Sequence, residues 1–207
     1  MCLIVMGLYA QNLEVVGKAK ITVMDTVTDV SANVERQTDG TLALRHYKIG
    51  DMTQGGIVFY IDESGEHGLV SDTVDLASPG DAADFTYQWS AVYDTTGARG
   101  DGIGAGAMNT LLIVSAQRGD TDSAARLCAD LVRGGYGDWY LPSKEELNLM
   151  YNNLKVAGLG GFKSTFYWSS TESSSNNAWK QPFGSGTQLI FNKNNSSFVR
   201  VRAVRAF

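Results

Sequence analysis

The stretch GDWYLPSKEEL at residues 137–147 joins a short apolar strand to the start of a helix. Ser143 is the expected N-cap, because a serine side chain accepts a hydrogen bond from a backbone N–H left unpaired at a helix start. Glu146 follows at the Ser-x-x-Glu spacing of a capping box, in which its carboxylate binds back to the N-cap N–H. The apolar spacing continues through Met150, so we expect a helix to about residue 153. This strand–turn–helix unit is the centre of the predicted domain.

Upstream of this unit, the sequence predicts a β-hairpin. Residues 55–61 are an apolar strand, residues 62–66 are typical of a turn, and residues 67–70 form the return strand. Gly65 can adopt the positive φ that such a turn requires.

An irregular segment and two helices are expected between the hairpin and the central unit. Residues 71–106 are rich in Asp, Gly, Ser and Thr, and we expect Trp89 and Tyr93 to anchor them. The apolar spacing then predicts helices at residues 108–117 and 123–132, the second ended by a Gly-Gly pair.

Downstream, a glycine-rich break is followed by expected strands at residues 167–170, 178–179, 188–191 and 198–204. Alternation in the last strand places Val199 and Val201 on one face and the arginines on the other. We expect Arg202 or Arg205 to pair with Glu172 or another buried acid. Strands at both ends with helices between them predict an α+β fold, with a single domain over residues 47–207.

The first 46 residues differ in character from the rest. Residues 12–46 alternate small apolar and polar residues, which predicts short strands that cannot form a core alone. We expect a β-rich stalk or oligomerisation segment, with a homotrimer as the hypothesis. Residues 1–11 are either the remnant of a signal peptide or a buried first strand.

Composition excludes several classes of protein. The net charge of −5 over 207 residues gives no electrostatic reason to expect nucleic acid as a partner. No run of apolar residues is long enough for a transmembrane segment. Cys2 and Cys128 are the only cysteines, so a disulfide framework is not expected, and Cys128 is interpreted as a buried apolar residue.

Catalytic and metal-binding motifs are missing, so we expect neither an enzyme nor a cofactor. No phosphate-binding loop, His-Glu-x-x-His or Gly-x-Ser-x-Gly element occurs in the sequence. Residues 100–106 are glycine-rich but are interpreted as a flexible turn, and His67 has no neighbouring nucleophile. With only His46 and His67 available, we expect no zinc site. The Asp-x-Asp-x-Asp-Gly calcium loop is missing as well, so no residue is assigned to a metal, and calcium held by loop carbonyls stays an open alternative.

Residues 171–198 mix Asn, Ser and Gly with isolated aromatic residues. That combination joins adaptable hydrogen bonding to rigid anchors, as in antibody paratopes. Trp168, Trp179 and Phe183 interleave the segment, so we expect it to be held against the core.

Four separated blocks carry a family resemblance: GGIVFYID at residues 55–62, GDWYLPSKEEL at 137–147, YWSSTE at 167–172 and RAVRAF at 202–207. They resemble the C-type-lectin-fold domains of bacterial and phage surface proteins. Most similar are the variable proteins of diversity-generating retroelements, related to lectin-like Lcl-type C-terminal domains. The resemblance covers about residues 47–207 and implies a C-type-lectin-like domain with short strands and two to three helices.

The resemblance also implies a variable ligand-binding face at residues 173–198, because a retroelement rewrites adenines, above all in Asn codons of the AAC type. The implied positions are Ser173, Ser174, Lys180, Pro182, Gly184, Ser185, Thr187, Leu189, Ile190, Phe191 and Phe198. Lys180 departs from this pattern, because mutation of adenines in AAC never yields Lys. The implied fixed framework is Trp179, Gln181, Phe183, Gly186 and Gln188.

The expected function is therefore non-catalytic recognition of a partner protein or receptor, outside the cell on a bacterial surface or a virion. Leu189, Ile190 and Phe191 are interpreted as an apolar patch that suits a protein interface. The alternative is an adhesin or carbohydrate-binding module of fixed specificity. The Glu-Pro-Asn and Trp-Asn-Asp motifs of animal C-type lectins are missing from the sequence, which argues against calcium-dependent sugar binding. Formylglycine-generating enzymes share the fold class, but their catalytic cysteine pair is missing as well.

Overall fold

The computed structural model describes residues 34–36, 42–44, 47–76, 87–90, 93–117, 119, 122–195 and 199–207. By its internal contacts the chain divides into two units, Met1–His46 and Tyr47–Phe207. In the first unit, strands β1 (Val34–Arg36) and β2 (Leu42–Leu44) pair antiparallel. The signal-peptide alternative at residues 1–11, most of the expected stalk and Phe198 lie outside the described residues.

One sheet of the second unit brings the expected hairpin together with the C-terminal end of the chain. Its strand order is β10-β5-β4-β3, with β3 at Met52–Thr53, β4 at Gly56–Ile61, β5 at Gly68–Ser71 and β10 at Val204–Ala206. The β4–β5 hairpin was predicted, and Gly65 in its turn has a φ of 76°.

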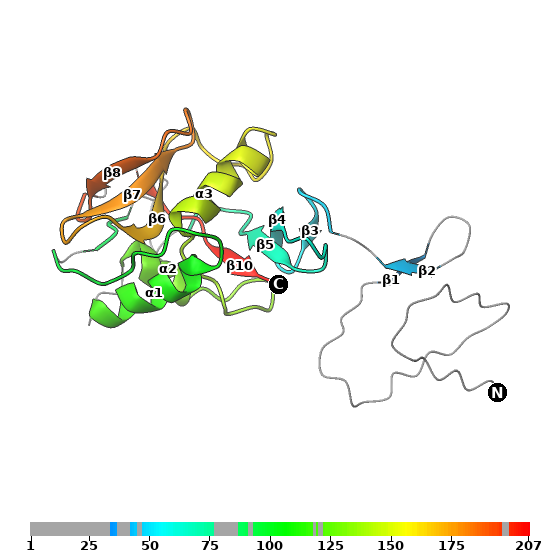
Figure 1. The fold of residues 1–207 in the computed structure, drawn as a ribbon, viewed down its shortest axis with the longest axis horizontal. Helices are drawn as coiled ribbons and strands as arrows, with labels where there is room; N and C mark the ends of the chain where they lie inside the picture. The colour runs from blue at the N-terminus through cyan, green and yellow to red at the C-terminus, as the bar shows by residue number, and fades with distance from the viewer. Residues whose placement is uncertain are drawn as a thin grey trace. The chain divides into compact units, whose positions relative to one another are not determined.

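The other sheet carries the polar segment. Its strand order is β8-β7-β6-β9, with β6 at Phe166–Glu172, β7 at Asn177–Pro182, β8 at Leu189–Asn192 and β9 at Val199–Arg200. Strand β9 runs parallel to β6, whereas the β6–β7 and β7–β8 pairs are antiparallel. In Figure 1, β8 is the outermost strand of this sheet.

Helices pack against both sheets, so the mixed α+β class is confirmed. Helix α1 spans Ala105–Ala116, α2 spans Ala124–Ala129 and α3 spans Lys144–Met150, which continues into the π-helical turn η1 (Tyr151–Lys155). The capping box that starts α3 is formed as expected: the Ser143 hydroxyl accepts from the N–H of Glu146, whose carboxylate accepts from the N–H of Ser143 at 2.7 Å. None of the described helices combines the length and apolarity needed to cross a bilayer.

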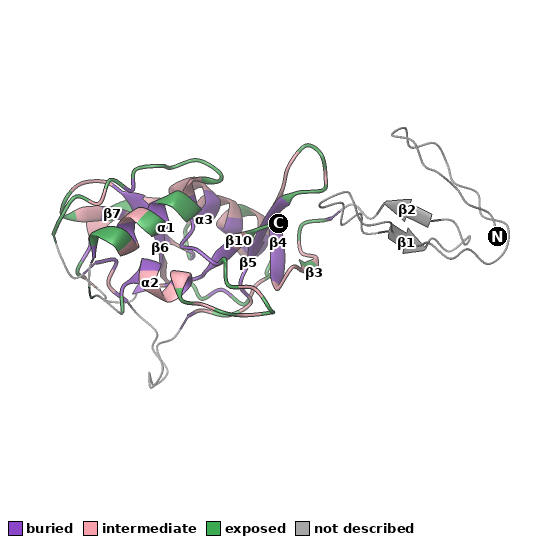
Figure 2. Cartoon of the chain, turned by 90° about the horizontal axis from the view of Figure 1, so that it is seen from below, coloured by how far each residue is buried: buried purple, intermediate pink, exposed green. Residues whose placement is uncertain are grey.

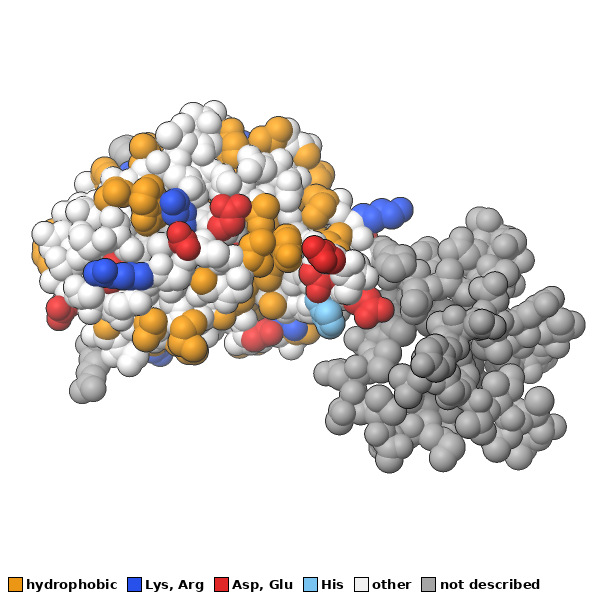
Figure 3. Space-filling model, in the orientation of Figure 1, with side chains coloured by type: hydrophobic (Ala, Val, Ile, Leu, Met, Phe, Trp, Pro, Cys, Tyr) orange, Lys and Arg blue, Asp and Glu red, His pale blue; other side chains and the backbone are white. Residues whose placement is uncertain are grey.

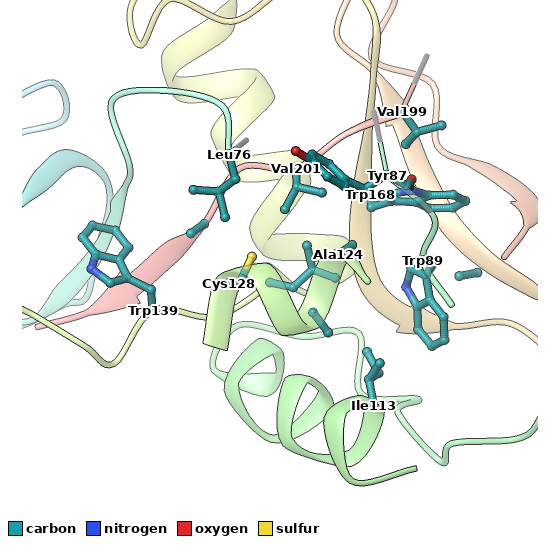
Figure 4. Close-up of a cluster of buried hydrophobic side chains, with 14 of the residues drawn as sticks. Leu76, Tyr87, Trp89, Ile113, Ala124, Cys128, Trp139, Trp168, Val199 and Val201 are labelled. Atoms are coloured by element: carbon teal, nitrogen blue, oxygen red, sulfur yellow. Dashed lines mark hydrogen bonds between the residues drawn. The ribbon is translucent and has the colours of Figure 1, made fainter. Parts of the chain in front are cut away.

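The core joins residues from every part of the second unit. Trp89 and Trp168 are completely buried and form one cluster with Val199, Val201 and the α2 residue Ala124 (Figure 4). Cys128 of α2 points into the same cluster, as expected for a buried apolar residue. Strands β4 and β5 are buried along most of their length (Figure 2).

Two expectations for the core segments were wrong. The described residues 199–204 do not form one strand: after β9 the chain leaves the sheet, and the carbonyls of Val201 and Ala203 accept from the N–H groups of Leu76 and Asp72 before β10 begins. The period-2 alternation of the sequence does not show where pairing with β6 ends and bonding to residues 72–76 begins. Tyr93 is not a buried anchor, since 49% of its surface is exposed.

Arg202 and Arg205 bind acidic residues other than Glu172, the first partner that the sequence suggested. Arg202 is buried and its guanidinium binds Asp75, with Nε 2.9 Å and Nη2 2.6 Å from Oδ1. Arg205 binds Asp138 at the surface. The expectation of another buried acid is confirmed, and a pairing of either arginine with Glu172 is wrong, because Glu172 is occupied by Lys193.

Candidate binding surface

The β7–β8 hairpin and its turn form the part of the polar segment that reaches solvent. We call its exposed positions the hairpin surface; they are Gly184, Ser185, Thr187, Leu189 and Ile190. Among the described residues, no side-chain hydrogen bond involves Ser185 or Thr187. These side chains are therefore directed to solvent and do not hold the fold.

The remaining predicted positions fall into three groups. Ser173, Ser174, Pro182 and Phe191 are half-buried, Lys180 is buried, and Phe198 lies outside the described residues. The Ser174 hydroxyl accepts from the N–H of Asn176 and of Asn177, so it orders the β6–β7 turn. The structure thus brings the turn and strand β8 together at the surface and sets Lys180 beneath it.

Gln181 and Phe183 attach the hairpin to the domain. Gln181 is fully buried and its amide donates to Oδ1 of Asn148 at 3.1 Å and to the carbonyl of Gly186 at 2.8 Å. The ring of Phe183 packs against Tyr167, with ring centroids 4.5 Å apart. Both side chains are buried, whereas Pro182 between them is half-buried and Gly184 after them is exposed.

Gly186 and Gln188 fix the turn between the strands. Gly186 has a φ of 79°, and a Cβ placed there would collide with the ring of Tyr151. Gln188 donates its amide to the carbonyl of Lys144 at 2.7 Å, which joins the start of β8 to helix α3. Framework and surface residues therefore alternate along residues 181–190.

A buried ion pair closes the other end of the hairpin. Lys193 Nζ lies 2.5 Å from Glu172 Oε1, and neither side chain is accessible to solvent. Lys193 also donates to the carbonyl of Asp94, and Glu172 accepts from the N–H groups of Thr96 and Gly97. Burial raises the pKa of Glu172, but the hydrogen bonds from Lys193 and from these backbone groups outweigh it and lower the pKa overall.

Lys180 is held under β8 by aromatic rings. Its Nζ lies 3.1 Å from the ring centroid of Phe191 and 3.8 Å from that of Phe166, an arrangement typical of cation–π contacts. Burial lowers the pKa of Lys180 to about 8. A side chain that is only 3% exposed does not contact a partner directly.

Strand β8 distributes its apolar side chains over two faces. Leu189 pairs with Lys180 and Phe191 with Ala178, so both lie on one face of the sheet, whereas Ile190 pairs with Trp179 on the other. The three residues therefore do not form the single patch that was expected. The ring of Trp179 is covered by Lys144, whose Nζ lies 4.1 Å from its centroid.

The hairpin surface is uncharged. No Asp, Glu, Lys or Arg occurs between Lys180 and Lys193. In Figure 3 the region over β7 and β8 shows apolar side chains among polar and backbone atoms, with a Lys or Arg side chain beside them. The hairpin surface suits contacts made by shape and hydrogen bonding, since its own side chains carry no charge.

Other candidate chemistry is not assembled in the described part of the chain. No group of three or more His, Cys, Asp or Glu residues there is arranged to hold a metal ion. His67 is exposed beside the hairpin turn. Residues 100–106 are not a free turn: the N–H of Gly104 donates to Glu146 at 2.8 Å, and the N–H of Gly100 donates to Asn109.

Several residues of the site were missed from the sequence. Three contacts join residues that are distant in the chain. They are the ion pair of Glu172 with Lys193, the hydrogen bond of Gln181 to Asn148 and the cation–π contact of Lys144 with Trp179. No local pattern distinguishes such residues from ordinary surface polar residues.

Comparison with known proteins identifies one family. The family model described as the Lcl C-terminal domain matches residues 77–205. No curated protein matches the sequence. Among solved structures, a fimbrial protein from Bacteroides ovatus is similar, with 14% sequence identity and a TM-score of 0.44 over 86% of this chain and 48% of that one. The chain thus spans about half the length of that structure.

Proposed function

The chain belongs to the Lcl C-terminal domain family, and from this premise we propose that it is a non-catalytic binding protein of C-type-lectin-like fold. Its hairpin surface recognises a partner protein or receptor outside the cell, on a bacterial surface or a virion. The side chains of that surface are diversified by a retroelement, while the framework beneath them is kept.

One observation carries the proposal: structural and exposed residues alternate along the hairpin. Gln181, Phe183 and Gln188 hold the hairpin by buried packing or side-chain bonds. Ser185 and Thr187, between them, are exposed and make no side-chain hydrogen bond within the described residues. Exchange of the exposed side chains therefore alters what the surface binds and leaves intact the contacts that fix its backbone.

A protein partner is favoured over a sugar by two features. Leu189 and Ile190 are 40% and 51% exposed, which suits apolar anchors of a protein interface. The one tryptophan of the hairpin, Trp179, has the ammonium of Lys144 over its ring, so less of the ring is open for a sugar to stack on.

Deep sequencing of the gene within one population tests the proposal. We expect substitutions in codons 173–198 to concentrate at the hairpin surface and at adenines of a nearby template copy. The codons of Gln181, Phe183 and Gln188 are the matched control and are expected to stay constant. Uniform codons throughout would overturn diversification and leave a fixed-specificity adhesin.

A further inference from the structure

Within the described residues, strand β8 pairs with β7 alone, and its hydrogen-bonding pattern identifies the groups that face away from β7. The N–H of Lys193 donates to the carbonyl of Asn176 at 2.9 Å, next to the pairing of Asn177 with Asn192. In an antiparallel ladder the bonded residues alternate, so residues 189, 191 and 193 bond to β7. Ile190 therefore directs its N–H and C=O away from β7, and within the described residues neither group has a partner.

This edge lacks several of the features that normally block strand addition. Edge strands are usually protected by being very short, by a charged side chain, a proline or a bulge, or by a covering loop. Strand β8 has four residues, and the Tyr93 hydroxyl donates to Oδ1 of Asn192 at its end, so the open part of the edge lies at Ile190. Residues 189–192 contain neither charge nor proline, and their register with β7 is continuous. The edge is also flanked by exposed apolar side chains, Leu189 on one face of the sheet and Ile190 on the other.

We propose that the outer edge of β8 binds an extended, uncharged segment of the partner protein as an added strand. The inference rests on the proposed function and deepens it, because it names the mode of binding at the same surface. Backbone hydrogen bonds at Ile190 supply affinity that does not depend on side-chain identity, and the side chains on either face supply specificity. The backbone hydrogen bonds therefore stay the same when the side chains of the surface change.

A partner segment is favoured over a second copy of the chain. Pairing of two β8 strands would join only residues 189–192 of each chain. That contact is far smaller than the total of about 1,200 Å² or more that specific interfaces bury. A different protein can add contacts with the turn residues Ser185 and Thr187, which lie on the same hairpin.

The test uses the full chain and the synthetic peptide acetyl-Thr-Val-Thr-Val-Thr-Val-Thr-amide as an uncharged strand. We expect saturable binding by NMR, with slower hydrogen exchange at the amide of Ile190 and little change at the amide of Phe191, which already bonds to β7. Absence of a saturable chemical-shift change at Ile190 overturns the proposal. The proposal is also overturned if, without peptide, hydrogen exchange at the Ile190 amide slows as the protein concentration rises, because a second copy of the chain then occupies the edge.

Ile190→Pro and Ile190→Thr form the matched pair of variants. Proline removes the outward donor without removing a bond to β7, and threonine keeps both the donor and the β-branched shape. We expect peptide binding to weaken about tenfold or more for the proline variant and to be retained in the threonine variant. Equal weakening of peptide binding in the two variants overturns binding through the backbone of Ile190.

If the proline variant does not fold, hydrogen exchange at the Ile190 amide of the unmodified chain, with and without peptide, decides the question. Population sequencing is independent of this result, so failure of the strand contact leaves the proposed function standing.

Discussion

Lys193 and Glu172 form an ion pair of 2.5 Å with no solvent access to either side chain. The pair joins the end of β8 to the end of β6, and the backbone bonds of Glu172 extend it to residues 96–97. The shape of the hairpin surface thus depends on two residues that do not reach the surface themselves.

Removal of one partner of this pair is expected to destabilise the chain strongly. Glu172→Gln leaves the ammonium of Lys193 buried without a counter-charge, at a cost of about 3–5 kcal/mol in the free energy of unfolding. Denaturant titration measures this. The matched control is Asp130→Asn, which breaks the exposed pair with Arg126 and is expected to cost about 0.5 kcal/mol or less. Similar losses in the two variants would contradict the structural role of Glu172.

Lys180 is expected to make stability depend on pH in the alkaline range. Its pKa is about 8 in the folded chain, against about 10.4 for an unperturbed lysine. Between these values the unfolded chain binds the proton and the folded chain does not, so stability rises with pH. Below pH 8 both states are protonated and this contribution is constant. The measurement is the denaturation midpoint of the unmodified chain and of the Lys180→Met variant at pH values from 7 to 10.5. A difference between the two midpoints that does not change with pH would refute the prediction.

Gly186 is expected to be far less tolerant of substitution than Gly184. Gly186→Ala places a Cβ at a φ of 79° and against the ring of Tyr151, which is expected to cost about 1–3 kcal/mol. Gly184→Ala meets only ordinary contacts near Ser164, so a change within about 0.5 kcal/mol is expected. Thermal unfolding of the two variants provides the comparison, and equal shifts would argue against the strained turn.

Cys128 is expected to be unreactive in the folded chain. Its thiol is completely buried, and burial followed by the nearby charge of Asp72 raises its pKa well above the ordinary value. In a Cys2→Ser variant, Cys128 is the only thiol, and a thiol reagent should label it only as the chain unfolds. Rapid labelling under native conditions would show that the cluster around α2 opens readily.

The sequence predicted the parts of the fold that local chemistry determines. The capping box of Ser143 and Glu146 and the β4–β5 hairpin depend on residues close in the chain, so their spacing is sufficient evidence. The separation of β9 from β10 was missed, because the two strands pair with β6 and β5 in different sheets, and alternation in the sequence does not report which strand is the partner.

The candidate site was less predictable than the fold. Exposure at Ser185 and Thr187 agrees with a polar, turn-like sequence. Burial of Lys180 and the pairing of Glu172 with Lys193 depend on rings and charges brought from other strands. A single sequence carries no period or spacing that reports such tertiary contacts.

The alternation of framework and surface residues along the hairpin has a consequence for stability. Ser185, Thr187 and Ile190 share no side-chain hydrogen-bond partner within the described residues. Substitutions at separated positions without shared partners tend to contribute additively to the free energy of unfolding. A substitution in the turn is therefore expected to change the stability of the chain by the same amount whichever residue stands at position 190.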